Sequence, residues 1–185
     1  MKNLLIISLL FLSVGLSQKE YNIERLLERD GVYIKKFSDE IVNGKVFQMF
    51  DDMKVPLGKM KDGKKDGLWT YWYDNGLKEK EGTYKDGKRD GLWMGWHENG
   101  LKEFEGTYKN GKNVGLVIIW YENGQRREER NYKDGKRDGL WTWYYDNGQK
   151  GREWTYKDGE DISSKCWNIY GNECECRDSM EVGCK

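Results

Sequence analysis

Hydrophobic and polar residues alternate over short stretches in the middle of the chain. In residues 67–73, alternation divides six side chains between two faces of an extended segment. One face carries Leu68, Thr70 and Trp72, and the other carries Trp69, Tyr71 and Tyr73. A period of two with many aromatic residues is typical of a β-strand, and residues 77–84 are predicted to form a second strand.

Two polar segments connect the predicted strands. Asp74-Asn75-Gly76 separates the first strand from the second, and Asn-Gly tolerates positive φ at both central positions of a tight hairpin turn. Residues 85–90 are predicted to form a longer polar turn that leads to the next strand. Neighbouring strands are therefore expected to be antiparallel.

The two-strand pattern recurs with a period of 24 residues. Full copies begin at Gly67, Gly91, Gly115 and Gly139. Residues 44–66 match as a degenerate first copy that contains Pro56, a residue typical of edge strands and hence of a capping unit. We therefore predict an all-β fold, an elongated single-layer antiparallel β-meander over residues 44–159. Its eight strands, or about ten with the degenerate copy, would advance the sheet about 9–10 Å per repeat.

Equivalent side chains of successive repeats are expected to form columns across the sheet. The columns on the face of Trp69 are the candidate binding residues, because exposed rows of aromatic rings often mark binding sites. The candidates are Trp69, Tyr73, Trp93, His97, Tyr121, Trp141 and Tyr145, with Val117 at the tryptophan position of the third repeat. The alternative is that these rings pack edge to face and shield one another.

The segments outside the array have different predicted roles. Residues 1–17 have the features of an export signal, with Lys2 ahead of an apolar run, Leu4–Leu12, that is too short to span a bilayer. Small residues at Gly15 and Ser17 suit cleavage before Gln18. We therefore expect export to the periplasm, the cell surface or the medium. Residues 18–43 are predicted to form an N-terminal cap.

The repeat pattern stops at Gly159, and a cysteine-rich segment follows. The chain's four cysteines are Cys166, Cys174, Cys176 and Cys184. In an exported protein an even number of cysteines favours disulfides, and direct bridging within Cys174-Glu175-Cys176 would be strained. The pairings left are 166–174 with 176–184, or 166–176 with 174–184, either of which would pin residues 160–185 as a small C-terminal cap. A four-thiolate zinc site is the alternative.

Charge and motifs argue against nucleic-acid binding and against catalysis. The chain has 32 basic and 32 acidic residues, and the balance holds within single repeats, so no basic face for nucleic acid is expected. The single histidine, His97, stands in a column otherwise filled by tyrosine and is interpreted as an aromatic substitute. Nucleophile-elbow, phosphate-loop and zinc-protease motifs are missing from the sequence. No catalytic residue, metal site or cofactor is predicted.

The repeat unit resembles a known family. Gly-Leu-Trp and Asp-Asn-Gly, followed by Gly-Thr-Tyr-Lys-Asp-Gly, are similar to the MORN repeat in its bacterial variant, over residues 44–159. That variant is found in proteins grouped as the YwqK-family antitoxins of toxin–antitoxin systems. The resemblance implies hairpin repeats that serve as an interaction module, an antitoxin-like role and no family catalytic site.

Together these features favour a non-enzymatic, exported repeat protein that presents an aromatic and charged sheet to an unidentified protein partner. The alternative is a cell-envelope or carbohydrate-binding module that uses exposed Trp and Tyr rings as stacking platforms. A cell-envelope glycan or a membrane surface would then be the partner.

Overall fold

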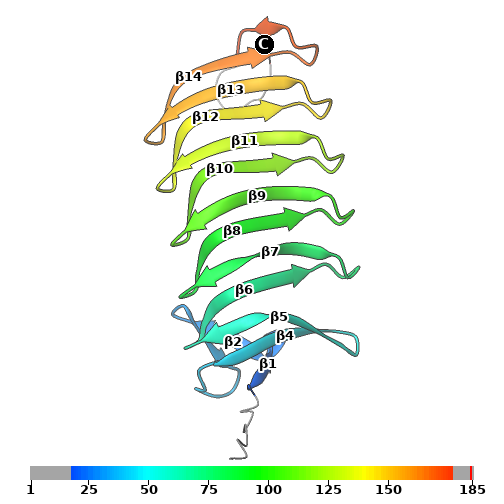
Figure 1. Cartoon of the computed structure of the whole chain (residues 1–185), viewed down its shortest axis with the longest axis vertical. Coiled ribbons are helices and arrows are strands. Elements are labelled where there is room, and N and C mark those ends of the chain that lie inside the picture. Colours follow the sequence, from blue (N-terminus) through cyan, green and yellow to red (C-terminus); the bar gives the residue numbers. More distant parts are fainter. Residues whose placement is uncertain (1–17, 177–183, 185) are drawn as a thin grey trace, which may run out of the picture.

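Each repeat forms one β-hairpin, and the hairpins stack edge to edge into a long sheet (Figure 1). The structure is a computed structural model that describes residues 18–176 and 184. The predicted export signal lies outside the described residues. The sheet has 13 strands, and from β4 to β15 each strand pairs with the next one in the chain. The predicted elongated, antiparallel all-β meander is thereby confirmed.

The four full repeats contribute eight strands of similar length. They are β6 (Lys64–Trp72), β7 (Lys78–Lys85), β8 (Lys88–Trp96), β9 (Lys102–Lys109), β10 (Lys112–Trp120), β11 (Arg126–Lys133), β12 (Lys136–Tyr144) and β13 (Lys150–Lys157). A bulge recurs at the same place in each repeat, as between Gly82 and Tyr84 in the pairing of β7 with β8. Bulges increase the local twist of a strand pair, so their repetition adds twist at regular intervals along the sheet.

The turns differ from the predicted ones in a systematic way. Asp86 and Gly87, with φ of 51° and 81°, form a two-residue turn between the paired residues Lys85 and Lys88. Lys88 to Asp90 therefore belong to β8 and not to a long turn. The loop at residues 74–76 is instead the longer one, and of its three residues Gly76 alone has positive φ. Asp86-Gly87 satisfies the two positive φ angles that a tight hairpin turn requires.

The degenerate copy forms the hairpin of β4 (Gly44–Phe50) and β5 (Met53–Lys61). Pro56 lies in the part of β5 that pairs with β4, whereas β6 pairs with β5 only at Lys59–Lys61. Its missing N–H therefore costs no ladder bond to β6. The indole N–H of Trp72 donates to the Pro56 carbonyl at 3.2 Å and links the two strands there.

A small cap closes the N-terminal end of the sheet. β1 (Glu20–Asn22) pairs in parallel with β4, and a 3-10 turn (Ile23–Arg25) leads to the hairpin of β2 (Leu26–Arg29) and β3 (Val32–Lys35). The backbone N–H of Tyr33 donates to the Gly63 carbonyl at 2.7 Å, which ties this hairpin to the array. The buried cluster between cap and array comprises Tyr21, Leu26, Val42, Val46, Leu57, Met60 and Trp69.

The sheet continues past Gly159, where the sequence pattern stops. β14 (Glu160–Trp167) pairs with β13, and β15 (Glu173–Cys174) pairs with the end of β14. The loop between them repeats the geometry of the earlier loops, since the N–H of Gly171 donates to the Asn168 carbonyl at 2.9 Å. β14 is therefore the first strand of a fifth, incomplete repeat. Across residues 18–176 and 184, no helix is long and apolar enough to cross a bilayer.

Candidate interaction surfaces

The tryptophan column is buried on one face of the sheet. We call this face the ring face, and it carries Trp69, Trp93, Val117 and Trp141. Trp69 and Trp93 are completely buried, and Trp141 is 8% exposed. Each indole N–H donates to the backbone carbonyl ten residues earlier: Lys59 for Trp69, Thr83 for Trp93 and Asn131 for Trp141, at 2.9–3.1 Å. The polar atom of each ring is thus satisfied where it is buried.

Glycines on the preceding strand make room for these rings. A Cβ on Gly58 would lie 2.6 Å from the ring of Trp69, and a Cβ on Gly82 would lie 2.2 Å from that of Trp93. Real Cβ atoms do not approach rings so closely, so glycine lets the indoles of Trp69 and Trp93 lie flat on the neighbouring strand, whereas Trp141 pairs with Arg130. The sequence analysis did not identify this role of the glycines.

Tyrosines and cations complete the packing on the ring face. Tyr84 lies between Trp69 and Trp93, with ring centroids 6.1 and 5.0 Å apart in edge-to-face geometry. The same arrangement surrounds Trp141, whose ring lies 5.3 Å from Tyr132 and 5.2 Å from Tyr156. A cation covers each tryptophan at 4.3–4.7 Å from its centroid, namely Lys65, Arg89 and Arg137. Such pairs hold the rings in place.

The first of these cations occupies an unusual site. The ammonium of Lys65 donates to the Tyr71 hydroxyl at 2.7 Å and lies 5.8 Å from the ring of Tyr33 in the N-terminal cap. Burial lowers the pKa of Lys65, because the charged ammonium loses hydration there. Burial also raises the pKa of Tyr71, and it raises that of Tyr33 to about 12. The Lys65 ammonium over the Tyr33 ring thereby joins the array to the cap.

The second predicted column forms a ladder of hydrogen bonds from one repeat to the next. The hydroxyl of Tyr73 donates to the carbonyl of Trp96 at 2.7 Å, and Tyr121 and Tyr145 donate in the same way to Tyr144 and Trp167. The Nε2 atom of His97 lies 3.1 Å from the Trp120 carbonyl. A carbonyl only accepts, so this geometry fits a ring protonated at Nε2. His97 replaces tyrosine in its bonding as well as in its position.

A ladder of asparagines, which the sequence prediction missed, follows the loops along one edge of the sheet. The side-chain amide of Asn75 donates to the Glu98 carbonyl of the next repeat at 3.1 Å, and its oxygen accepts the N–H of Leu77 at 2.9 Å. Asn99, Asn123 and Asn147 make the same two bonds. Their recurrence every 24 residues was visible in the sequence, but it was interpreted as turn chemistry alone.

The burial and the hydrogen bonds of the seven candidate binding residues decide whether they can contact a ligand. The three tryptophans among them, Trp69, Trp93 and Trp141, present little or no surface on which a ligand ring would stack. The other four are half-buried and bonded to backbone carbonyls. The alternative interpretation, in which the rings pack against one another, accounts for the geometry of this face.

The opposite surface, which we call the leucine face, exposes apolar side chains. Leu68, Leu92, Leu116 and Leu140 are 43–59% exposed. Each pairs across the strand with a small polar residue: Thr83, Thr107, Asn131 or Thr155. Neighbouring leucines lie one repeat apart, about 9–10 Å by strand spacing. The result is a regular row of apolar side chains along the sheet.

Next to the leucine row lies a column of half-buried aromatic rings, each of which belongs to the Trp72 position. Lysines cover three of them, with Nζ to centroid distances of 5.2–5.7 Å: Lys78 over Trp96, Lys102 over Trp120 and Lys150 over Trp167. Each lysine is held by the glutamate three residues later at 2.6–2.7 Å, as Lys78 is by Glu81. The glutamate column therefore fixes cations above rings.

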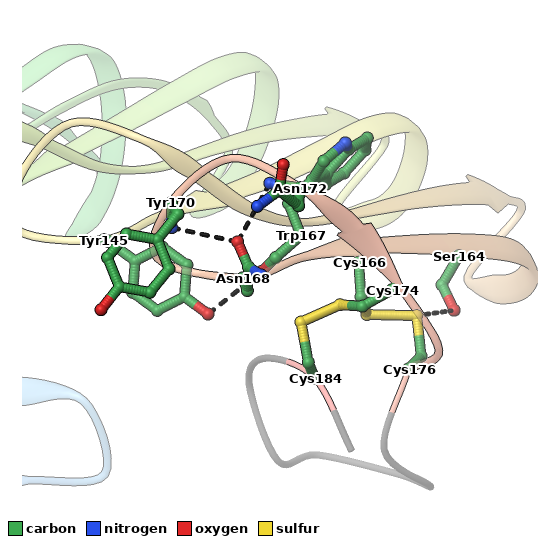
Figure 2. Close-up of a disulfide and its surroundings, with 10 residues drawn as sticks. All are labelled: Tyr145, Ser164, Cys166, Trp167, Asn168, Tyr170, Asn172, Cys174, Cys176 and Cys184. Atoms are coloured by element: carbon green, nitrogen blue, oxygen red, sulfur yellow. Dashed lines mark hydrogen bonds between the residues drawn. A yellow bond between two sulfur atoms is a disulfide. The ribbon is translucent and has the colours of Figure 1, made fainter.

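The cysteines form two disulfides, Cys166–Cys176 and Cys174–Cys184 (Figure 2). The disulfide prediction is confirmed, and the second of the two pairings is the one formed. No free cysteine is left for zinc among the described residues, and within the same residues no cluster of His, Cys, Asp or Glu is arranged to hold a metal ion. The bridges attach the end of the chain to β14 and β15, so they close the last edge of the sheet.

Comparison with known families finds the MORN repeat variant four times, at residues 65–86, 89–110, 113–134 and 137–158. Each match covers one hairpin, from the first strand to the tight turn at its end. Among curated proteins, none matches the chain.

Proposed function

Because the chain is a MORN-repeat protein, and such repeats generally mediate interactions with proteins or membranes, we propose that it is a non-enzymatic protein-binding module. The partner docks on the leucine face. The observation that carries this proposal is the row of four exposed leucines, each repeated at a fixed spacing on a regular sheet. Apolar rows bordered by polar residues are typical of protein-binding surfaces.

A protein partner is favoured over a glycan by the arrangement of the rings. Sugar-binding sites stack a sugar on an open ring face, but the tryptophans of the ring face are buried. On the leucine face, a sugar that stacks on Trp96, Trp120 or Trp167 would have to displace Lys78, Lys102 or Lys150 from that ring and from its glutamate. A protein can instead contact the leucines and pair with the charges beside them.

Site-specific photo-crosslinking tests the proposal. A benzophenone amino acid replaces Leu116 on the leucine face, and a matched protein carries it at Glu122 in an exposed loop. The proposal predicts one protein adduct of defined mass from position 116 and none from position 122. Equal labelling at both positions, or adducts with glycan and not with protein, would overturn it.

Two finer features extend the proposal. The two disulfides are consistent with an oxidising compartment, so we propose that the protein works after export. Following the resemblance to antitoxins, we also propose that docking blocks a harmful activity of the partner. Growth of cells that express the crosslinked partner, with and without this protein, tests that role: rescue is expected, and equal growth arrest would contradict it.

A further inference from the structure

The third repeat keeps the glycine that makes room for a tryptophan ring in the first two repeats, but it lacks the tryptophan. Val117 occupies the position of Trp93 and Trp141, and Asn113 occupies the position of Arg89 and Arg137. Gly106, which is equivalent to Gly58 and Gly82, is still glycine, and a Cβ there would lie 2.9 Å from the side chain of Val117. The two substitutions remove the ring and its covering cation together.

The groups that hold the ring in other repeats are present around Val117. In the second repeat, Trp93 lies between Tyr84 and Tyr108, at 5.0 and 6.4 Å. By the same register, Tyr108 and Tyr132 flank position 117. The carbonyl ten residues earlier, which accepts the indole N–H in three other repeats, is that of Thr107 here, and the valine side chain has no N–H to donate to it.

The missing ring leaves a groove of about 370 Å³ on the ring face, spanning β7 to β11. Its apolar lining includes Phe104, Val117 and Ile119, and its volume falls within the range of small-ligand sites. One buried polar atom at the groove has no hydrogen-bond partner, Asn113 Oδ1, whereas Arg127 Nε lies 3.4 Å from a carboxylate oxygen of Glu128. Buried polar groups are rarely left unpaired, so Asn113 Oδ1 is a candidate to bond a ligand.

The residues around the groove carry an excess of positive charge. Four basic residues line it, Lys80, Arg89, Arg127 and Arg130, against the two acidic residues Glu79 and Glu103. Lys80 pairs with Glu79, and Arg127 and Arg130 both pair with Glu128, which leaves an excess of one cation. This excess favours a ligand that carries a single negative charge.

We propose that this groove receives an aromatic side chain with a neighbouring carboxylate from the partner protein, so that the partner supplies the ring that the third repeat lacks. The ring lies over Val117, whose side chain covers Gly106, between Tyr108 and Tyr132, and a ring N–H donates to the Thr107 carbonyl or to Asn113 Oδ1. This inference rests on the proposed function, because it names a contact that the docked protein makes on the second face of the sheet.

N-acetyl-L-tryptophan serves as the probe in a titration of the isotopically labelled full chain by nuclear magnetic resonance. Shifts are expected at Asn113, Val117, Tyr108 and Tyr132, with saturation. The neutral N-acetyl-L-tryptophanamide should bind more weakly, by up to about five-fold, the contribution of one partly exposed ion pair. N-acetyl-L-leucine should not shift these signals.

Val117→Trp fills the groove from within and is expected to abolish probe binding while it raises thermal stability. Val117→Phe repeats the test with a smaller ring. Glu122→Gln, in the exposed loop that follows the same strand, should leave probe binding unchanged. Probe binding that persists in both filled variants, or a native protein that does not bind the probe, would overturn the inference. Crosslinking through position 116 is measured separately, so the proposed function survives that failure.

Discussion

At the level of single residues, glycines on neighbouring strands decide which face of the sheet becomes the interior. Alternation predicts two faces, and both carry aromatic residues, so alternation alone does not separate them. Gly58, Gly82 and Gly106 stand next to the tryptophan column and leave space for rings on that face only. The columns could therefore be predicted from the sequence, whereas the burial of Trp69 and Trp93 required the register between strands.

Gly82→Ala tests whether the glycine is needed to make room for the ring of Trp93. The added Cβ would lie 2.2 Å from the ring of Trp93, so the strand or the ring must shift. Overpacking of this kind costs about 1–3 kcal/mol of unfolding free energy. Chemical denaturation measures the change. Thr83→Ala, at the neighbouring exposed position, is the control, and equal losses in the two variants would contradict the account.

The buried hydroxyl groups predict a dependence of stability on alkaline pH. Burial raises the pKa of Tyr33 from its ordinary value of 10.0 to about 12, so the folded state binds the proton more tightly than the unfolded state. This contribution is complete below pH 10 and is lost as the pH rises to about 12. The lowered pKa of Lys65 acts in the opposite sense, but that effect is exhausted once the unfolded lysine is also neutral, above about pH 10.5.

The unfolding free energy of the wild type is therefore expected to fall between about pH 10 and pH 12. Tyr33→Phe keeps the ring but removes the titrating group, so its decline should be smaller. Denaturation monitored by circular dichroism across this range makes the comparison. A steeper decline in Tyr33→Phe than in the wild type would show that the hydroxyl does not act as described.

At the level of elements, the sequence predicted the strands well and exchanged the two kinds of turn. Asn75-Gly76 and Asp86-Gly87 are both typical of tight turns, and nothing local distinguishes them. The difference arises because Asn75 bonds to the next repeat through its side chain, which favours the longer loop. β14 was not predicted, because the backbone continues the strand pairing after the characteristic residues of the repeat have ended.

Gly87→Ala tests the assignment of the tight turn. With φ of 81°, Gly87 adopts a left-handed conformation that costs a residue with a Cβ about 1–2 kcal/mol. The expected result is a lower midpoint of thermal unfolding with an unchanged fold. Lys85→Ala, at the exposed strand end beside the turn, serves as the control. If both variants unfold at the wild-type temperature, the turn assignment is contradicted.

At the level of the whole molecule, stacked hairpins make the ends of the sheet the places where special closures are needed. The N-terminal end has a packed cap with a buried cluster, and the C-terminal end has two disulfides, each joining residues ten positions apart. The sequence predicted the disulfide end from its cysteines. The N-terminal cap was placed by residue range, but its parallel strand β1 had no recognisable pattern in three residues.

Reduction should therefore loosen one end of the molecule selectively. Short disulfide loops contribute about 2–3 kcal/mol, mainly by limiting the unfolded chain. Hydrogen exchange in the presence of a reductant should accelerate in β14 and β15 and remain slow in β8 and β9, which are distant along the stack (Figure 1). Uniform acceleration along the array would show that the bridges stabilise more than the terminal edge.

The central claim is that the ring face holds the sheet together and the leucine face is free to bind a partner. The most direct measurement compares the unfolding free energies of Trp93→Ala and of the double variant Leu92→Thr with Leu116→Thr. The account predicts a loss of about 3–5 kcal/mol for Trp93→Ala, as for other buried aromatic residues, and a smaller loss for the double variant. A larger loss in the leucine variant would show that the leucine face is the structural one.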